Sequence, residues 1–483
     1  MRTARETINA IRCGELSADR AVGECLDAIQ RKDPDIGAFL SVSAERARDR
    51  ARHVDRRLTA PDGAVDLPLA GLPVAVKDNL CTDFGTTTCA SKILEGYQSP
   101  YSAHVVERLE RAGAIVIGKC NLDEFAMGAS NEYSAYKPVR NPWDGNRVAG
   151  GSSGGPAAAV AAGMVPVALG SDTGGSIRMP ASLCGVVGLK PTYGRVSRYG
   201  LVAFGSSLDQ VGPLARTVED AAMVLSVIAG HDPRDATSLE APIPDYAAGL
   251  GKPIKGTRIG MYRPFFADGL EQHTRQAVEH AIDVLTGAGA TTVEVDLPHA
   301  HYAVACYYII ATAECSSNLA RFDGVHYGHR TADPDDIIDL YAASRHDGFG
   351  PEVIRRIMLG AYALSSGYYD AYYLRAMKVR TLLRRDFARA FENVDVIVAP
   401  VSPTTAYRLG EKSADPLAMY LTDVFTTAAN LAGLCAMSVP CGFDDRGLPI
   451  GMQLIGPVLS EQRLLALGHQ YQQLTDHHLR EPA

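Results

Sequence analysis

Two glycine-rich runs constrain this chain more than any other feature of its sequence. The first is Gly150-Gly151-Ser152-Ser153-Gly154-Gly155, and the second is Gly170-Ser171-Asp172-Thr173-Gly174-Gly175-Ser176. Glycine loses more conformational entropy on folding than any other residue, so runs of it indicate tight turns or close approach of the backbone to another group. Both runs also contain serines. We therefore expect loops that bring serine hydroxyls close to backbone N–H groups.

The pattern of apolar residues predicts an α/β fold. Short apolar runs at 74–76, 115–117 and 165–169 have the length of buried strands, and the segments 103–112 and 157–162 between them have helical spacing. Strands that alternate with helices predict a β-sheet covered by helices on both faces. Further strands are predicted at 257–261, 291–295 and 394–401, with helices at 274–285 and 352–390.

We expect a single domain over residues 1–483. Residues 1–57 form a helical lead-in, because their apolar positions recur at helical spacing. Residues 65–240 form a glycine- and serine-rich catalytic core. Residues 257–483 supply the rest of the sheet and the helices of a substrate pocket. The proline- and glycine-rich stretch 240–256 is predicted to be a surface connection.

Charge and composition exclude several classes of protein. The 47 Lys and Arg against 55 Asp and Glu give a net charge of −8, which disfavours unassisted binding to a phosphate backbone. No run of eighteen apolar residues is present, and the N-terminus lacks the apolar stretch of a secretory signal, so we expect a cytoplasmic protein without membrane contact. Ten cysteines without a C-x-x-C pair predict neither a disulfide scaffold nor a zinc site, and no metal is expected.

Several motifs fit known sites only in part. The first glycine run matches G-x-S-x-G, but the residues before it have loop composition, whereas a nucleophile elbow needs a strand there. The run lacks the G-K-[ST] ending of a P-loop. The pair Ser134 and Lys137 matches S-x-x-K without a K-T-G partner. The pair His326 and His329 is expected to be a surface feature rather than a metal site.

The second glycine run is the best candidate for a catalytic centre. Ser176 follows two glycines whose N–H groups could bind a developing oxyanion, and Ser152 could relay its proton. A serine nucleophile needs a base. Lys77 ends the apolar run 73–76, where desolvation would lower its pKa. Lys119 and Lys190 follow similar runs, so the residues alone do not choose among the three lysines.

Lys77 and the two glycine runs together resemble the amidase signature family. Lys77 precedes Ser152 by 75 residues, and Ser152 precedes Ser176 by 24, as in that family. The resemblance implies a large mixed β-sheet covered by helices, with Ser176 as nucleophile, Ser152 as proton carrier and Lys77 as base. It also implies a cis peptide bond between Gly151 and Ser152. The implied oxyanion hole consists of the N–H groups of Thr173, Gly174, Gly175 and Ser176.

Within this family, four segments resemble the glutamine-hydrolysing subunits of tRNA-dependent amidotransferases. They are residues 121–128, 190–198, 321–324 and 364–373. This resemblance implies that Arg356 binds the α-carboxylate of glutamine, that Asp423 binds its α-ammonium group and that Tyr307 lines the pocket. Arginine can bind a carboxylate through two parallel hydrogen bonds, which suits a free amino acid. Met179, Ala428 and Cys435 depart from the residues expected near this pocket.

The same resemblance implies partners that the chain itself does not contain. Ammonia would pass to a B subunit, which holds Glu-tRNA(Gln) and is assisted by a small C subunit. ATP and Mg²⁺ would be used by the complex, with no cofactor in this chain. Asp-tRNA(Asn) is a further candidate substrate. The alternatives are a stand-alone amidase for small aliphatic or aryl amides and a non-catalytic interaction protein on the same scaffold.

Overall fold

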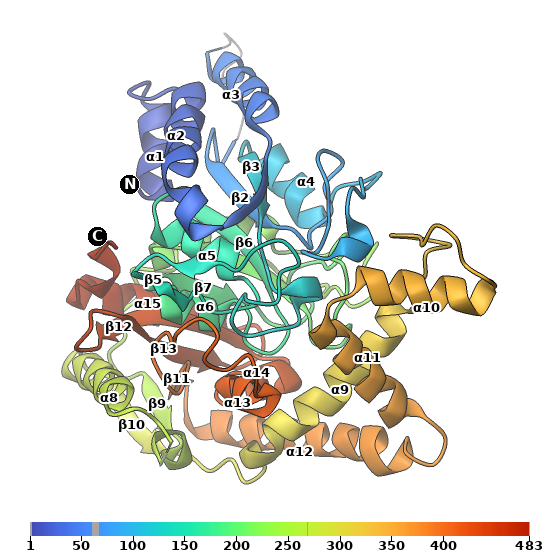
Figure 1. Cartoon of the computed structure of the whole chain (residues 1–483). Coiled ribbons are helices and arrows are strands. Elements are labelled where there is room, and N and C mark those ends of the chain that lie inside the picture. Colours follow the sequence, from blue (N-terminus) through green and yellow to red (C-terminus); the bar gives the residue numbers. More distant parts are fainter. Residues whose placement is uncertain (1, 60–66, 268, 483) are drawn as a thin grey trace.

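An eleven-stranded β-sheet runs through the middle of the protein (Figure 1). The computed structural model describes residues 2–59, 67–267 and 269–482, so the first two residues of the predicted 65–240 segment lie outside the described part. The strand order is β1-β3-β2-β6-β8-β7-β12-β13-β11-β9-β10. β3, β2 and β6 are parallel to one another, as are β11, β9 and β10, whereas the strands between β6 and β11 pair antiparallel. The predicted α/β fold with a mixed sheet is therefore confirmed.

The strands of this sheet and of a small two-stranded ribbon have the following bounds. They are β1 Phe39–Val42, β2 Pro73–Lys77, β3 Ile115–Cys120, β4 Arg140–Asn141, β5 Asp144–Val148, β6 Val167–Asp172, β7 Val187–Lys190, β8 Gln210–Ala215, β9 Arg258–Met261, β10 Thr291–Glu294, β11 Val396–Pro400, β12 Cys435–Phe443 and β13 Pro449–Gly456.

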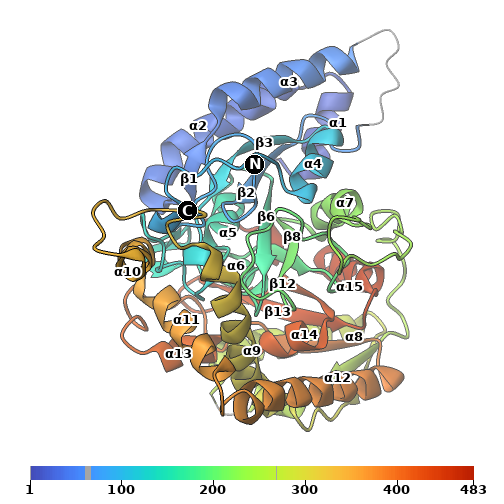
Figure 2. The same cartoon turned by 90° about the vertical axis from the view of Figure 1, so that its right-hand side faces the viewer.

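The described residues also form fifteen α-helices. They are α1 Ala4–Arg12, α2 Ala18–Ile36, α3 Ala44–Leu58, α4 His104–Arg111, α5 Gly154–Ala161, α6 Arg178–Cys184, α7 Val218–Ile228, α8 Gln272–Gly287, α9 Ala303–Asn318, α10 Ile337–Gly348, α11 Pro351–Leu364, α12 Arg375–Asn393, α13 Pro416–Tyr420, α14 Thr427–Ala432 and α15 Glu461–Leu474. Helices α1 to α3 lie at the top of both views, and α9, α11 and α12 form a group at the lower edge (Figures 1 and 2).

Alternation along the strands divides the core into two apolar clusters, one on each face of the sheet. Val74 and Val76 of β2 pack in the larger cluster, with residues of α4, α7, α8 and α15. Ala75 packs in the second cluster, with residues of α2, α3, α5 and α6. Successive side chains of a strand point to opposite faces, so Lys77 is directed to the same face as Ala75, towards α5.

Two secondary-structure predictions were incomplete. The lead-in 1–57 is helical except for β1, which pairs antiparallel with β3 and starts the sheet at one edge. The predicted helix 352–390 is wrong as one element, because α11 ends at Leu364 and α12 begins at Arg375. Ser365 adopts ψ 159°, outside the helical range, and Gly367 has φ +85°. This turn lets α11 and α12 each pack against α9.

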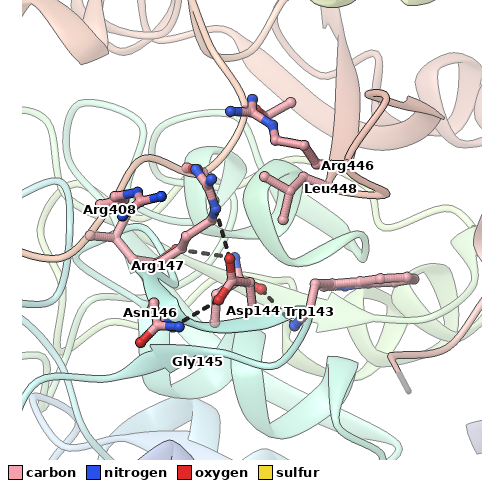
Figure 3. A network of polar contacts seen from close by, with 12 residues as sticks. Trp143, Asp144, Gly145, Asn146, Arg147, Arg408, Arg446 and Leu448 are labelled. Carbon is pink, nitrogen blue, oxygen red and sulfur yellow. Dashed lines mark hydrogen bonds and ion pairs between the residues drawn. The ribbon is translucent and has the colours of Figure 1, made fainter.

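The β4–β5 ribbon anchors the chain just before the first glycine-rich loop (Figure 3). The carboxylate of Asp144 accepts hydrogen bonds from the N–H of Asn146 at 3.0 Å and from Nε of Arg147 at 2.9 Å. Arg147 donates in turn to the carbonyl of Ala406 at 2.7 Å. The ribbon that leads into residues 149–153 is thereby tied to the segment after β11. It also corrects the loop composition expected before the G-x-S-x-G match, although its strands lie outside the large sheet.

Gly155 marks the closest approach of α5 to its neighbours. A Cβ atom there would lie 2.3 Å from the carbonyl oxygen of Asn121 and 2.6 Å from that of Ala38. We predict that Gly155→Ala lowers the free energy of unfolding by roughly 1–3 kcal/mol, because two backbone carbonyls would have to move. Gly145→Ala is the matched control, since nothing lies within 4 Å of its added Cβ. Urea unfolding monitored by circular dichroism checks this, and equal midpoints for the two variants would contradict it.

Candidate active site

The candidate site lies where β2 and β6 end beside the two glycine-rich loops. Lys77 is the last residue of β2, and Asp172 is the last residue of β6. Because β2 and β6 are parallel neighbours, their carboxyl ends meet at the same edge. The first loop leads into α5 and the second into α6. Open α/β sheets bind ligands at such strand ends.

The amine of Lys77 is completely buried among serine hydroxyls. Its Nζ lies 2.7 Å from Oγ of Ser152, 2.9 Å from Oγ of Ser153 and 2.9 Å from Oγ of Ser171. Burial disfavours the charged ammonium and lowers the pKa of Lys77 to about 7, although nearby carboxylates act in the opposite direction. A substantial fraction of this amine is therefore neutral near pH 7.

The hydrogen bonds indicate which serine gives its proton to that amine. A neutral amine offers two N–H donors and one lone pair. The hydroxyl of Ser153 donates to the carbonyl of Ser171 at 3.0 Å, and Oγ of Ser171 already accepts from Asn79. The Ser152 hydroxyl makes its one side-chain hydrogen bond within the described residues to Lys77. The hydroxyl proton of Ser152, unlike that of Ser153, is therefore available to the lone pair of Nζ.

The two competing lysines occupy different surroundings. Nζ of Lys119 forms an ion pair with Oδ1 of Asp78 at 3.0 Å. Nζ of Lys190 donates to the carbonyls of Pro191 and Leu434. Neither donates to a serine, so the geometry favours Lys77. Because the carboxylate of Asp78 pairs with Lys119, it does not form an ion pair with Lys77, the residue before it.

The backbone brings Ser176 next to the Lys77 and Ser152 pair. The N–H of Ser153 donates to the carbonyl of Ser176 at 3.1 Å, which joins the two glycine-rich loops. The peptide bond between Gly151 and Ser152 is cis, as the resemblance implied. Ser176 is 7% exposed, and within the described residues its hydroxyl makes no hydrogen bond to protein. Its oxygen is thus available to a bound substrate.

A buried ion pair holds the loop that carries Ser176. The guanidinium of Arg178 contacts both carboxylate oxygens of Asp172 at 3.0 Å, and both residues are fully buried. Although burial opposes ionisation, Arg178 holds the pKa of Asp172 at about 2. Asp172 then accepts from the N–H of Gly175 at 2.9 Å and of Ile177 at 3.2 Å. The loop conformation therefore depends on a charge inside the core.

These contacts change the predicted set of oxyanion donors. The N–H of Gly175 is already donated to Asp172, so it is not free for a substrate oxygen. The N–H groups of Thr173, Gly174 and Ser176 make no hydrogen bond to the described protein and remain the candidate donors. The carbonyl of Gly174 accepts from Oγ1 of Thr426 at 2.6 Å, so both polar groups of the Gly174–Gly175 peptide are bonded to the protein.

The predicted pocket residues lie on the far side of the same loop. Tyr307 of α9 packs against Gly174, where a Cβ would lie 2.7 Å from the phenol oxygen. Arg356 of α11 is 2% exposed, and its Nε donates to Oε1 of Glu352 at 2.8 Å.

Burial raises the pKa of Asp423 to about 7. Tyr308 donates to Oδ2 of Asp423 at 3.0 Å and lies 5.2 Å from the Arg356 guanidinium. Tyr308 thus links the predicted cation and anion.

Three further pocket residues were missed by the sequence analysis. Glu352 pairs with Arg356, the hydroxyl of Tyr420 donates to Glu352 at 2.9 Å, and Phe204 faces the guanidinium of Arg356 at 5.7 Å. The four-residue spacing of Glu352 and Arg356 on a predicted helix was a usable signal. Tyr420 and Phe204 gave none, because they are far from Arg356 in the sequence.

Met179, Ala428 and Cys435 are all buried near these elements. Met179 packs in a small cluster with Leu183 and Met419, and Cys435 donates to the carbonyl of Pro457 at 3.2 Å. None of the three makes a hydrogen bond through its side chain to Lys77, Ser152 or Ser176 in the described part of the chain. Their departure from the expected residues therefore leaves the hydrogen bonds of Lys77 intact.

Metal-binding groups and membrane-spanning helices are both lacking in the described ranges. Within residues 2–59, 67–267 and 269–482, no three His, Cys, Asp or Glu side chains are grouped so that they could bind a metal ion. Over the same residues, no helix combines the length and apolar character needed to cross a membrane. His326 lies on the surface, where its Nδ1 contacts Asp323 at 2.8 Å, a neighbouring carboxylate that the motif did not reveal.

We predict that the reactivity of Ser176 follows the protonation of Lys77. A fluorophosphonate that labels activated serines should react faster as the pH rises through about 7, because the amine loses its proton and becomes a base. Lys77→Ala should abolish this labelling, whereas Lys190→Ala should retain it if the variant folds. Mass spectrometry of the labelled peptide provides the measurement. Labelling of Ser176 that is unchanged in Lys77→Ala would contradict the assignment.

Comparison with known proteins agrees with this geometry. The amidase family model matches residues 20–465. The chain is 55% identical to the A subunit of glutamyl-tRNA(Gln) amidotransferase from Synechococcus sp. (strain RCC307) over 97% of this chain and 96% of that protein. It is also 55% identical to the protein of the same name from Carboxydothermus hydrogenoformans over 99% of this chain and 98% of that one.

Solved structures of similar proteins have the same fold. The crystal structure of the glutamyl-tRNA(Gln) amidotransferase A subunit from Thermotoga maritima matches with a TM-score of 0.79 and 44% identity, and covers 96% of this chain and 93% of that one. Native peptide amidase from Stenotrophomonas maltophilia matches with a TM-score of 0.84 and 31% identity, and covers 100% and 98%. Sequence and structure together show that this chain belongs to the amidase family.

Proposed function

We propose that this chain is the glutamine-hydrolysing subunit of a glutamyl-tRNA(Gln) amidotransferase. The observation that carries the proposal is the buried Lys77 amine, bonded to Ser152 beside the loop that carries Ser176. The full-length similarity to proteins named as A subunits of glutamyl-tRNA(Gln) amidotransferase supports the choice of substrate. The buried cation and anion of Arg356 and Asp423 suit a free amino acid.

In the proposed mechanism, Ser176 attacks the side-chain amide carbon of glutamine. Its proton passes to Ser152 as Ser152 gives its own to neutral Lys77. The oxyanion accepts hydrogen bonds from the free N–H groups of the Thr173 to Ser176 loop. The protonated Lys77 then returns a proton through Ser152 to the departing nitrogen, the C–N bond breaks and ammonia leaves. A glutamyl ester of Ser176 remains, which water hydrolyses through the same relay.

The pocket would hold glutamine by its two charged groups. Nε of Arg356 is taken by Glu352, so the two Nη atoms are left to bind the α-carboxylate side by side. Asp423 would accept from the α-ammonium group, and Tyr308 fixes the orientation of its carboxylate. Tyr307, against Gly174, would close the pocket between these charges and the oxyanion donors.

The rest of the reaction would belong to partner subunits. We propose a B subunit that receives the ammonia, holds Glu-tRNA(Gln) and uses ATP and Mg²⁺, and a small C subunit that assists assembly. The net charge of −8 is consistent with another chain holding the tRNA.

Loss of the nucleophile tests the proposed reaction directly. We expect Ser176→Ala to reduce glutamine hydrolysis by about 10⁴-fold or more, because residues that act as one catalytic unit lose nearly all activity together. Ammonia release from glutamine by the complex with its B and C subunits is the measurement, with amidation of Glu-tRNA and Asp-tRNA followed separately. Free ammonium should restore the amidation of Glu-tRNA. Efficient cleavage of neutral amides with no activity on glutamine would instead favour a stand-alone amidase.

Arg356 tests recognition of glutamine rather than chemistry. Arg356→Met should lower kcat/KM for glutamine by on the order of 10- to 100-fold, the loss of a charge-assisted pair, mainly through a higher KM. Hydrolysis of 4-aminobutanamide, which lacks the α-carboxylate, should change little. Arg389→Met, at an exposed arginine of α12, is the matched control. Equal losses of kcat/KM on both substrates would show that Arg356 does not bind the α-carboxylate.

A further inference from the structure

Asp123 is a buried carboxylate that takes no part in the proposed proton transfer. It follows β3, is fully buried and has no Lys, Arg or His within 4 Å among the described residues. Its oxygens accept from the backbone N–H of Asn131 at 2.9 Å and of Tyr133 at 3.1 Å. The two N–H donors provide hydrogen bonds to the carboxylate but do not neutralise its charge. Burying a charge without a counterion is energetically costly, which indicates a role of Asp123 that requires the charge.

The contacts of Asp123 lead to the loop that carries the proton relay. A Cβ at Gly151 would lie 2.0 Å from Oδ2 of Asp123, and a Cβ at Gly128 would lie 2.3 Å from its carboxyl carbon. The carboxylate therefore packs directly on the backbone of Gly151, the residue before Ser152. The N–H of Asp123 also donates to the carbonyl of Ser152 at 3.3 Å. Both the main chain and the side chain of Asp123 thus contact the segment that places the Ser152 hydroxyl.

The charge distribution around Lys77 gives the carboxylate a second role. Among the acids whose fields favour the ammonium form of Lys77, Asp123 acts most strongly, followed by Asp172 and Asp209. The charge of Asp172 is offset by Arg178 in direct contact. Asp209 is held by the hydroxyl of Thr173 at 2.7 Å, and Cys89 adds a weaker effect. The counter-charge for a protonated Lys77 is therefore mainly Asp123.

The groups that face Asp123 leave its charge available in the neutral range. Burial raises the pKa of Asp123 to about 6, and the two backbone donors and Lys77 act against this rise. The field of Glu132 on the adjacent loop raises it slightly further. Above pH 6 the carboxylate is therefore mostly ionised, which covers the range in which Lys77 loses its proton.

We propose that Asp123 is a positioning residue with two roles. It fixes the Ser152 loop, and it supplies the counter-charge for Lys77 when the Lys77 amine accepts a proton from Ser152. The inference rests on the proposed role of Lys77 as the base. A carboxylate in direct contact would keep the lysine permanently protonated. A carboxylate held one loop away stabilises the ammonium as it forms and still lets it give the proton back.

The pH dependence of the enzyme distinguishes this role from a structural one. In Asp123→Asn the amine of Lys77 loses its counter-charge, so its pKa falls, and the acid limb of kcat/KM for glutamine should move to lower pH by about one unit. The maximal rate should fall with little change in KM. Gly128→Ala is the matched control, because it displaces the same carboxylate and keeps its charge. It should lower the rate and move the acid limb by less than Asp123→Asn does.

Labelling of Ser176 by a fluorophosphonate, measured over the same pH range, separates the role of Lys77 from that of Asp123. If labelling of the wild-type protein showed no acid limb, the role of Lys77 itself would fail. If the wild-type limb were present and Asp123→Asn left it unmoved, only the role of Asp123 would fail. Asp123→Ser, a smaller neutral replacement, serves if the asparagine variant does not fold. Asp123→Glu keeps the charge and should keep the wild-type limb. A folded Asp123→Glu whose limb has moved to lower pH would also overturn the counter-charge role.

Discussion

The burial of one amine among hydroxyl groups is the constraint from which the rest of this site follows. An ammonium in the core is costly unless it is paired, whereas a neutral amine with three serine oxygens within 2.9 Å is well accommodated. The protein therefore obtains a base near neutral pH from a residue that is normally protonated. The surrounding packing is correspondingly tight, as Gly155 shows where α5 approaches the backbone carbonyls of Ala38 and Asn121.

Three other buried cations near the site each pair with a carboxylate, whereas Lys77 does not. Lys119 has Asp78, Arg178 has Asp172 and Arg356 has Glu352. Removing one member of such a pair would leave an uncompensated charge in the core. The pairs also have a geometric effect, because Asp172 holds the Ser176 loop and Glu352 directs the Nη atoms of Arg356. The same ion pairs that stabilise the charges thus also orient the groups of the proposed site.

The pocket on the α9 and α11 side combines hydrogen bonds with aromatic faces. Tyr308 and Tyr420 stack with ring centroids 4.0 Å apart and both lie 5.2 Å from the guanidinium of Arg356. Cation–π contacts of this kind favour a charged guanidinium in a poorly hydrated place. The break between α11 and α12 matters here, because it lets both helices pack against α9, which carries Tyr307 and Tyr308.

The sequence by itself predicted the alternation of strands and helices in an α/β fold, the two glycine-rich loops and, through the family resemblance, the residues of the proposed relay. These features are local, since apolar period, glycine clustering and fixed spacing are readable along the chain. Only the tertiary structure separated Lys77 from Lys119 and Lys190, removed the Gly175 N–H from the oxyanion set and revealed Glu352, Tyr420 and Asp123 beside the site. Those outcomes depend on which groups meet after the chain has folded, and contacts such as Tyr420 to Glu352 or Asp123 to Gly151 join segments that no local pattern relates.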